Sequence, residues 1–257
     1  MRKPFGCLGL VLLVLTGAMS PSSSVFAEPV AKAAAEKAPP LAPHAMVAAA
    51  NPLAVEAGLA VLKRGGSAVD AAVAVQAMLG LVEPQSSGLG GGAFMVFYDA
   101  KTRAVTAYNG RETAPAGASP DMFMRTDANG VAKPIGFFEA VVSGRATGVP
   151  GAVAMLSLAQ SQHGKLAWKD LFGDAERRAS DGFIVSPRLA GMINSAAPQA
   201  KSADATAYFT KPDGTRYQAG DVLKNPAYAA TVRRIATEGA SALYQGPLAE
   251  AIVARVQ

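Results

Sequence analysis

Cysteine is nearly absent from this chain: the only one among its 257 residues is Cys7. A single cysteine can form no disulfide within the chain and no thiolate metal site. Histidine is almost as scarce, since only His44 and His163 occur. Neither histidine neighbours a serine and an acid as in a catalytic triad, and two distant histidines do not predict a metal site. The sequence therefore predicts no metal and no cofactor.

Long runs of charge are also missing. Charged residues make up 17% of the chain, hydrophobic residues 50%, and the formal net charge is +5. This composition is sufficient for a hydrophobic core and argues against disorder. No cluster of lysine and arginine is interleaved with aromatic residues, so no nucleic-acid partner is expected.

No apolar run near the N-terminus is long enough to span a membrane. Arg2 and Lys3 precede a short apolar stretch at Leu8–Leu15, and small or apolar residues end at Ala27. This order is typical of a signal peptide over residues 1–27, with an uncleaved anchor as the alternative. We therefore expect a secreted or periplasmic protein that leaves the membrane after cleavage. Residues 28–43, rich in Ala, Lys and Pro, predict a flexible leader.

Two helices after this leader are predicted by their caps. Asn51-Pro52 suits a helix start, and the helix is expected to end at Gly65. Ser67 and Asp70 have the spacing of a capping pair, and an alanine-rich helix is expected from there to about Val82. So many small side chains permit close packing on a neighbouring element.

Strand patterns are few and lie early in the chain. Residues 93–98 and 104–109 predict a hairpin, and residues 46–50 and 139–143 predict single strands. Helices are expected later, at residues 152–160, 168–180, 187–195, 226–238 and from 247 onward. Strands followed by helices indicate an α+β fold rather than strict βαβ alternation. The last helix runs to Gln257 without a C-cap, so we expect an interrupted chain.

A glycine-rich loop, SSGLGGGA, occupies residues 86–93. It formally matches a dinucleotide-binding pattern, but that pattern requires a strand before the loop and a helix after it. Here a helix ends before Pro84 and a strand follows, so nucleotide binding is not expected. The alternative is that the glycines permit tight packing beside a sheet.

Arg111 follows the second strand of the predicted hairpin. A guanidinium at a strand end can bind a carboxylate through two parallel hydrogen bonds. The alternative is a surface arginine paired with Glu112 or another acid. Residue type alone favours that alternative, because most arginines are exposed.

Three blocks of sequence resemble the γ-glutamyltransferase (glutathione hydrolase) family. They are residues 51–72, residues 86–115, and a third set at residues 147–151, 163–165 and 181–183. Further matches are Phe209, Gly220-Asp221, Pro226, Ile235-Ala236 and Tyr244-Gln245-Gly246. The resemblance extends in order over residues 44–257, which are expected to form a large-subunit-like domain, incomplete at its C-terminus.

The resemblance implies an N-terminal-nucleophile hydrolase with an αββα sandwich and a precursor that cleaves itself into large and small subunits. A threonine at the new N-terminus would accept a γ-glutamyl group from glutathione or a related amide and pass it to water or an amino acid. Its own α-amine can act as base, so no histidine is needed. Among these residues the resemblance assigns substrate binding to Arg111, on the α-carboxylate, and only a structural role to the Gly88–Gly92 loop.

The chain departs from the family in one respect. No threonine here has the Thr-Thr-His-type context of the nucleophile, so the chain contains no catalytic residue and is expected to be inactive alone. Its expected partner is a small subunit. Two other interpretations stay open: a cephalosporin-acylase-type amide hydrolase, and a non-catalytic subunit of a split enzyme.

Overall fold

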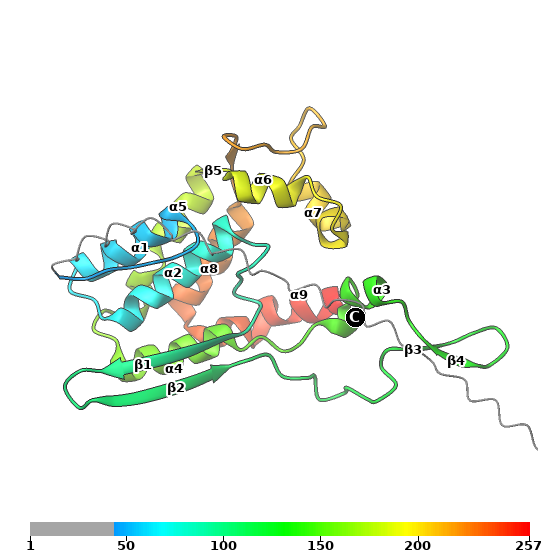
Figure 1. Cartoon of the computed structure of the whole chain (residues 1–257), viewed down its shortest axis with the longest axis horizontal. Coiled ribbons are helices and arrows are strands. Elements are labelled where there is room, and N and C mark those ends of the chain that lie inside the picture. The colour runs from blue at the N-terminus through cyan, green and yellow to red at the C-terminus, as the bar shows by residue number, and fades with distance from the viewer. Residues whose placement is uncertain (1–43) are drawn as a thin grey trace, which may run out of the picture. The chain divides into compact units, whose positions relative to one another are not determined.

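The structure is a computed structural model that describes residues 44–257. The predicted signal peptide, residues 1–27, and leader, residues 28–43, lie outside the described residues. Within residues 44–257 the chain forms nine α-helices, four short 3-10 helices and six strands (Figure 1). Every strand pair in that range is an antiparallel hairpin or a two-residue antiparallel ladder, so the fold is α+β as expected.

The first two helices begin where their caps predict. In α1 (Pro52–Lys63) the Asn51 side chain accepts a hydrogen bond from the backbone N–H of Leu53. In α2 (Ala68–Val82) Ser67 and Asp70 form a reciprocal capping box. Both sequence predictions are confirmed, because capping depends only on residues within one turn of each other.

Helix α2 lies in the middle of the helical layer. It packs against α1, α4 (Ala152–His163) and α5 (Gly173–Asp181), and α5 in turn packs against α8 (Pro226–Glu238). The small residues of α2 make this possible: a Cβ at Gly80 would lie 2.5 Å from the Tyr228 hydroxyl. That hydroxyl donates a 2.7 Å hydrogen bond to the carbonyl of Ala77. The close packing expected from the alanine-rich sequence is therefore present.

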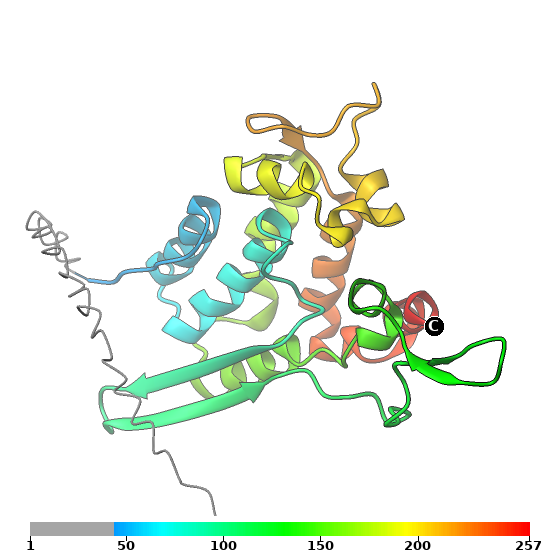
Figure 2. The ribbon, with the colours of Figure 1, turned by 45° about the vertical axis from the view of Figure 1, so that its right-hand side comes forward.

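The predicted hairpin is confirmed as β1 (Ala93–Asp99) and β2 (Ala104–Gly110), paired from Ala93 opposite Gly110 to Asp99 opposite Ala104. Helix α4 runs along the hairpin in both views (Figures 1 and 2). One face of β1 turns Met95 and Phe97 toward the core, whereas Phe94, Val96 and Tyr98 on the other face are exposed.

Two of the predicted strands are wrong. Residues 139–143 belong largely to a single helical turn, α3 (Phe137–Val141), and residues 46–50 are in no strand. A short apolar run does not distinguish strand from helix, and neither segment has a partner strand among residues 44–257. Three short elements were not predicted from the sequence. They are the hairpin strands β3 (Met124–Thr126) and β4 (Ala132–Pro134) and the 3-10 helix η1 (Gly144–Ala146).

The later helices follow the prediction with two differences: one predicted helix is divided, and α7 (Ala203–Tyr208) was not predicted. Helices α6 (Pro187–Ile193), α8 and α9 (Gly246–Val256) are as expected, but residues 168–180 divide into η2 (Trp168–Leu171) and α5. The other short elements here are β5 (Phe183–Ile184), η3 (Pro198–Lys201), α7 (Ala203–Tyr208), β6 (Val222–Leu223) and η4 (Ala240–Leu243). No helix among residues 44–257 has the length and apolar content needed to cross a membrane.

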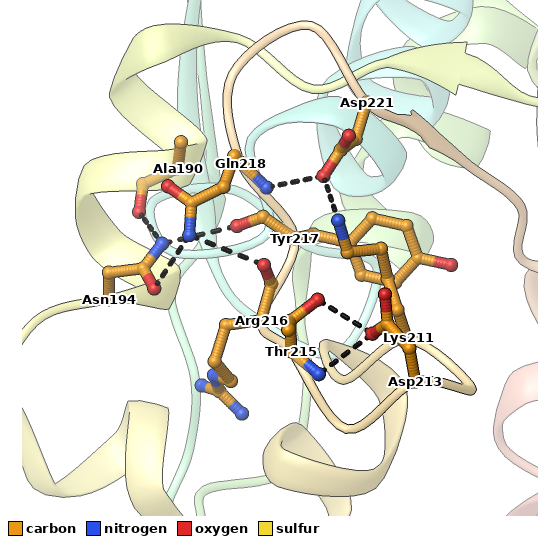
Figure 3. A network of polar contacts seen from close by, with 9 residues as sticks. All are labelled: Ala190, Asn194, Lys211, Asp213, Thr215, Arg216, Tyr217, Gln218 and Asp221. Atoms are coloured by element: carbon orange, nitrogen blue, oxygen red, sulfur yellow. Dashed lines mark hydrogen bonds and ion pairs between the residues drawn. The ribbon is translucent and has the colours of Figure 1, made fainter.

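The loop between α7 and β6 is held by polar contacts (Figure 3). The Nδ2 of Asn194 donates to the carbonyls of Ala190 and Tyr217, and Lys211 pairs with Asp221 at 3.1 Å. Arg216 donates to the carbonyls of Ile193 at 2.7 Å and Ala200 at 2.8 Å. One guanidinium thus binds the C-terminal ends of α6 and η3, where backbone carbonyls lack helical partners.

Candidate functional site

The candidate site forms where β2 ends. A Cβ at Gly110 would lie 2.6 Å from the Cβ of Met155, so only glycine lets the strand end pack directly on the start of α4. The next residue, Arg111, turns outward: its side chain is 69% exposed, and its backbone N–H donates to Oδ1 of Asn109. The structure therefore places the predicted substrate-binding residue at an accessible strand end.

Glu112 occupies a narrow slot between two glycines from distant segments. A Cβ at Gly92 would lie 2.7 Å from the Cδ of Glu112, and a Cβ at Gly148 would lie 2.8 Å from its Cβ. Its Oε2 lies 3.2 Å from Nη1 of Arg111 and is otherwise buried without a hydrogen-bond partner. The residue's own backbone N–H, and then the Arg111 charge, hold the pKa of Glu112 below its usual range against desolvation.

The segments around this slot are joined through the backbone. The carbonyl of Gly91 accepts hydrogen bonds from the N–H groups of Gly151 and Ala152, which begin α4. Thr113 and Val149 form an isolated antiparallel bridge, with hydrogen bonds of 3.3 and 2.8 Å. These contacts bring together two of the sequence blocks noted above, residues 86–115 and 147–151.

The glycine loop forms one wall of an open cleft of about 450 Å³. The cleft is lined by Gln76, by Glu112 and by most of the loop from Pro84 to Gly92. As expected from the sequence, α2 precedes the loop and β1 follows it, so no helix N-terminus is presented to a pyrophosphate. The glycines at 91 and 92 instead allow backbone and carboxylate to approach closely.

Other candidate residues lie elsewhere. His163 ends α4, where its Nε2 lies 2.7 Å from the Tyr108 hydroxyl and its ring stacks on Phe97. These are packing contacts of a helix end. Among residues 44–257 no three His, Cys, Asp or Glu side chains are grouped so that they could hold a metal ion.

The sequence analysis named Arg111 as a candidate but did not predict the residues that surround it. Glu112 entered the prediction only as a competing partner of Arg111, and the structure shows that ion pair. The role of Gly148 was not predicted at all. The only sequence signal for it is the clustering of glycines at 148 and 151, which could not identify Glu112 as their neighbour.

Comparison with known proteins identifies the family of the chain. Residues 54–257 match the family model described as gamma-glutamyltranspeptidase. The chain is 42% identical over 212 residues to the glutathione hydrolase proenzyme of Bacillus subtilis, covering 82% of this chain and 35% of that protein. It therefore spans about a third of the length of that curated relative.

Solved structures of the same family align with the chain. The gamma-glutamyltranspeptidase of Helicobacter pylori aligns with a TM-score of 0.73 and 33% identity, over 82% of this chain and 59% of that one. The enzyme of Pseudomonas nitroreducens aligns with the same TM-score and 31% identity, over 84% of this chain and 61% of that one. The fold is thus an α+β portion of an N-terminal-nucleophile hydrolase. The chain belongs to the gamma-glutamyltranspeptidase family and covers its N-terminal, large-subunit portion.

Proposed function

We propose that this chain is the large-subunit portion of a secreted or periplasmic γ-glutamyltransferase. The enzyme would transfer or hydrolyse the γ-glutamyl groups of glutathione and related amides through a threonine acyl-enzyme. The family match over residues 54–257 supports this reaction class. Residues 44–257 would form the large-subunit-like domain, with a cleaved signal peptide before it and a small subunit as its partner.

The observation that carries the proposal is the exposed guanidinium of Arg111 beside the glycine-lined cleft. A substrate α-carboxylate can form two parallel hydrogen bonds with such a group. The competing ion pair with Glu112 is no obstacle, because Arg111 is largely exposed and such pairs contribute only about 0–1 kcal/mol. We therefore expect Arg111 to exchange Glu112 for the carboxylate of the γ-glutamyl group.

Bond cleavage requires a nucleophile that these residues do not supply. No threonine in the chain has the context of the family's nucleophile, so the purified chain should not release p-nitroaniline from γ-glutamyl-p-nitroanilide. Turnover by the chain without a partner would contradict this assignment.

Binding can be tested without turnover. The full chain is titrated with L-glutamate and with glutathione while backbone amide shifts of residues 109–113 are followed by NMR. We expect Arg111→Ala to weaken binding at least tenfold, which corresponds to about 1.4 kcal/mol. Arg103→Ala is the matched control, because Arg103 lies in the turn at the opposite end of the same hairpin. Its binding should stay within about twofold of wild type.

Two results would overturn the role of Arg111. One is equal affinity of the Arg111 and Arg103 variants; the other is binding that survives Arg111→Ala unchanged. A chain that binds a cephalosporin acyl side chain but no γ-glutamyl compound would favour the related acylase instead. N-terminal sequencing of the exported protein tests the localisation, with Glu28 expected as the first residue.

A further inference from the structure

Glu83 is a buried carboxylate directly before the glycine loop. It is 1% exposed and caps the end of α2. Its Oε1 accepts a hydrogen bond from Nδ2 of Asn51 at 3.0 Å. Its Oε2 accepts from Nε2 of Gln85 at 2.6 Å and from Nη1 of Arg188 at 2.8 Å. One side chain therefore joins the start of α1, the start of α6 and Gln85, which directly precedes the glycine loop.

A buried carboxylate paired with a half-exposed arginine is poorly explained by stability alone. Removing a carboxylate from water is costly, and a well-packed apolar residue at the same place is often as stable or more so. The desolvated charge is compensated here by three donors arranged around it. Hydrogen bonds are directional, so these three donors fix the position of the segments that carry them. Nonpolar contacts at the same site are not directional and would fix it less well.

The position that Glu83 fixes is that of the loop. Besides holding Gln85 through its side chain, Glu83 accepts hydrogen bonds from the N–H groups of Ser86 and Ser87 through its carbonyl, both at 3.0 Å. Two further anchors of the loop are neutral: Gln76 donates to the carbonyl of Gly88, and the carbonyl of Gly91 accepts from the start of α4. The Glu83 end is anchored by a carboxylate that is 1% exposed, whereas the carboxylate next to Gly92, that of Glu112, belongs to a side chain that is 30% exposed.

The loop leads from this anchor to the candidate site. Gln85 lines the same cleft as Glu112, and Gly92 forms one side of the slot that holds the Glu112 side chain. Glu112 in turn pairs with Arg111. A displacement of the loop would change the space left for Glu112 and, through the backbone, the strand end that carries Arg111.

We propose that Glu83, held by Arg188, is a positioning residue that fixes the glycine loop, and through it the Glu112 slot beside Arg111. The effect of Glu83 on substrate binding rests on the proposed function, whereas its effect on the loop is independent of that function.

The variant Glu83→Gln keeps the shape of the side chain but replaces one acceptor oxygen with an NH₂ donor. In one orientation of the amide its NH₂ group faces the donor of Asn51, and in the other it faces the donors of Gln85 and Arg188. Either way at least one hydrogen bond is replaced by two donors that face each other. Asp70→Asn is the matched control: it also removes the charge of a fully buried carboxylate on α2, but Asp70 contacts Ser67 and the segment after α4, not the loop. Arg188→Gln and Arg188→Lys test the charged partner.

The measurement is amide hydrogen exchange of the full chain, read at Ser86, Ser87 and Gly91 and compared with Val232 in α8. For Glu83→Gln we expect exchange at the loop amides at least tenfold faster than in wild type, with a smaller change in α8. Arg188→Gln should have the same pattern more weakly, and Arg188→Lys should restore the protection. Asp70→Asn should not accelerate the loop selectively.

The proposal is overturned if Glu83→Gln accelerates exchange equally in the loop and in α8, because Glu83 then serves global stability. It is also overturned if the loop amides are unchanged, or if Asp70→Asn reproduces the loop effect. In the L-glutamate titration, Glu83→Gln should weaken binding at least fivefold. A wild-type chain that binds no γ-glutamyl compound would refute the proposed function, whereas the exchange result would still decide the role of Glu83.

Discussion

The carboxylate of Asp70 gives the sharpest test of what holds the helices together. The residue is fully buried, with 0% exposure, and forms the capping box of α2. Its Oδ2 also accepts hydrogen bonds from the backbone N–H groups of Lys165 at 2.8 Å and Leu166 at 3.2 Å, and its Oδ1 accepts from Gln160. Asp70 therefore connects the start of α2 to the segment that follows α4.

The expected cost of Asp70→Asn follows from these contacts. The amide keeps one acceptor oxygen, places a donor where the other oxygen was, and loses the charge. Hydrogen bonds to charged groups contribute about 1.5–3 kcal/mol, against about 1 kcal/mol for neutral ones. Weakening the three backbone hydrogen bonds while losing the Gln160 contact should cost about 3 kcal/mol. For a domain of this size the melting temperature should fall by roughly 6–12 °C.

The unfolding free energy that Asp70→Asn loses should also depend on pH. Burial raises the pKa of Asp70, but the hydrogen bonds from Ser67, Lys165, Gln160 and Leu166 outweigh it and hold the pKa below its usual range. A depressed folded-state pKa gives stability that is present above the unfolded value of about 3.9 and is lost as the pH falls through the folded value. The wild type and Asp70→Asn should therefore differ fully at pH 7 and converge in acid.

Urea unfolding at pH 7 and at several acidic values measures both effects. Asp213→Asn is the control, because Asp213 is an exposed turn residue that bonds only Thr215 nearby. It should change the unfolding free energy by no more than about 0.5 kcal/mol. A loss below about 1 kcal/mol for Asp70→Asn, or a difference that grows as the pH falls, would refute the reasoning.

Three further predictions concern close contacts. Gly92→Ala should lower the melting temperature, since the new Cβ would meet the Glu112 carboxyl group and, at 2.9 Å, its backbone nitrogen. Adding Glu112→Ala to the same chain should restore only part of the loss, because the contact with the backbone nitrogen remains. Gly80→Ala should destabilise by about 1–3 kcal/mol by crowding the Tyr228 hydroxyl, and Tyr228→Phe should relieve part of this in a double-mutant cycle. Arg216→Ala should expose the segment between α6 and β6 to limited proteolysis before the rest unfolds, because it removes the donor shared by two helix ends.

A specific result would contradict each of these three predictions. Additive losses for the Gly92 and Glu112 changes, or for the Gly80 and Tyr228 changes, would show that the paired groups do not compete for space. Cleavage of the Arg216 variant at the same sites and rates as wild type would show that this guanidinium does not hold the segment.

Much of the fold was predictable from local patterns. The caps at Asn51 and Ser67, the helix at 226–238 and the hairpin at 93–110 are all as expected. The failures at 46–50 and 139–143 are short apolar runs, for which strand and helix have the same signal and the outcome depends on whether a partner strand is near.

The sequence by itself determined where the capped helices α1 and α2 begin, that the glycine loop follows a helix and precedes a strand, that Arg111 lies at a strand end, and which family the motifs resemble. These are properties of residues within a few positions of each other. The tertiary structure alone decided that Gly92 and Gly148 enclose Glu112, and that Glu83 meets Arg188. These contacts join residues 20, 36 and 105 positions apart, and they exist only once the helices have packed and brought their ends together.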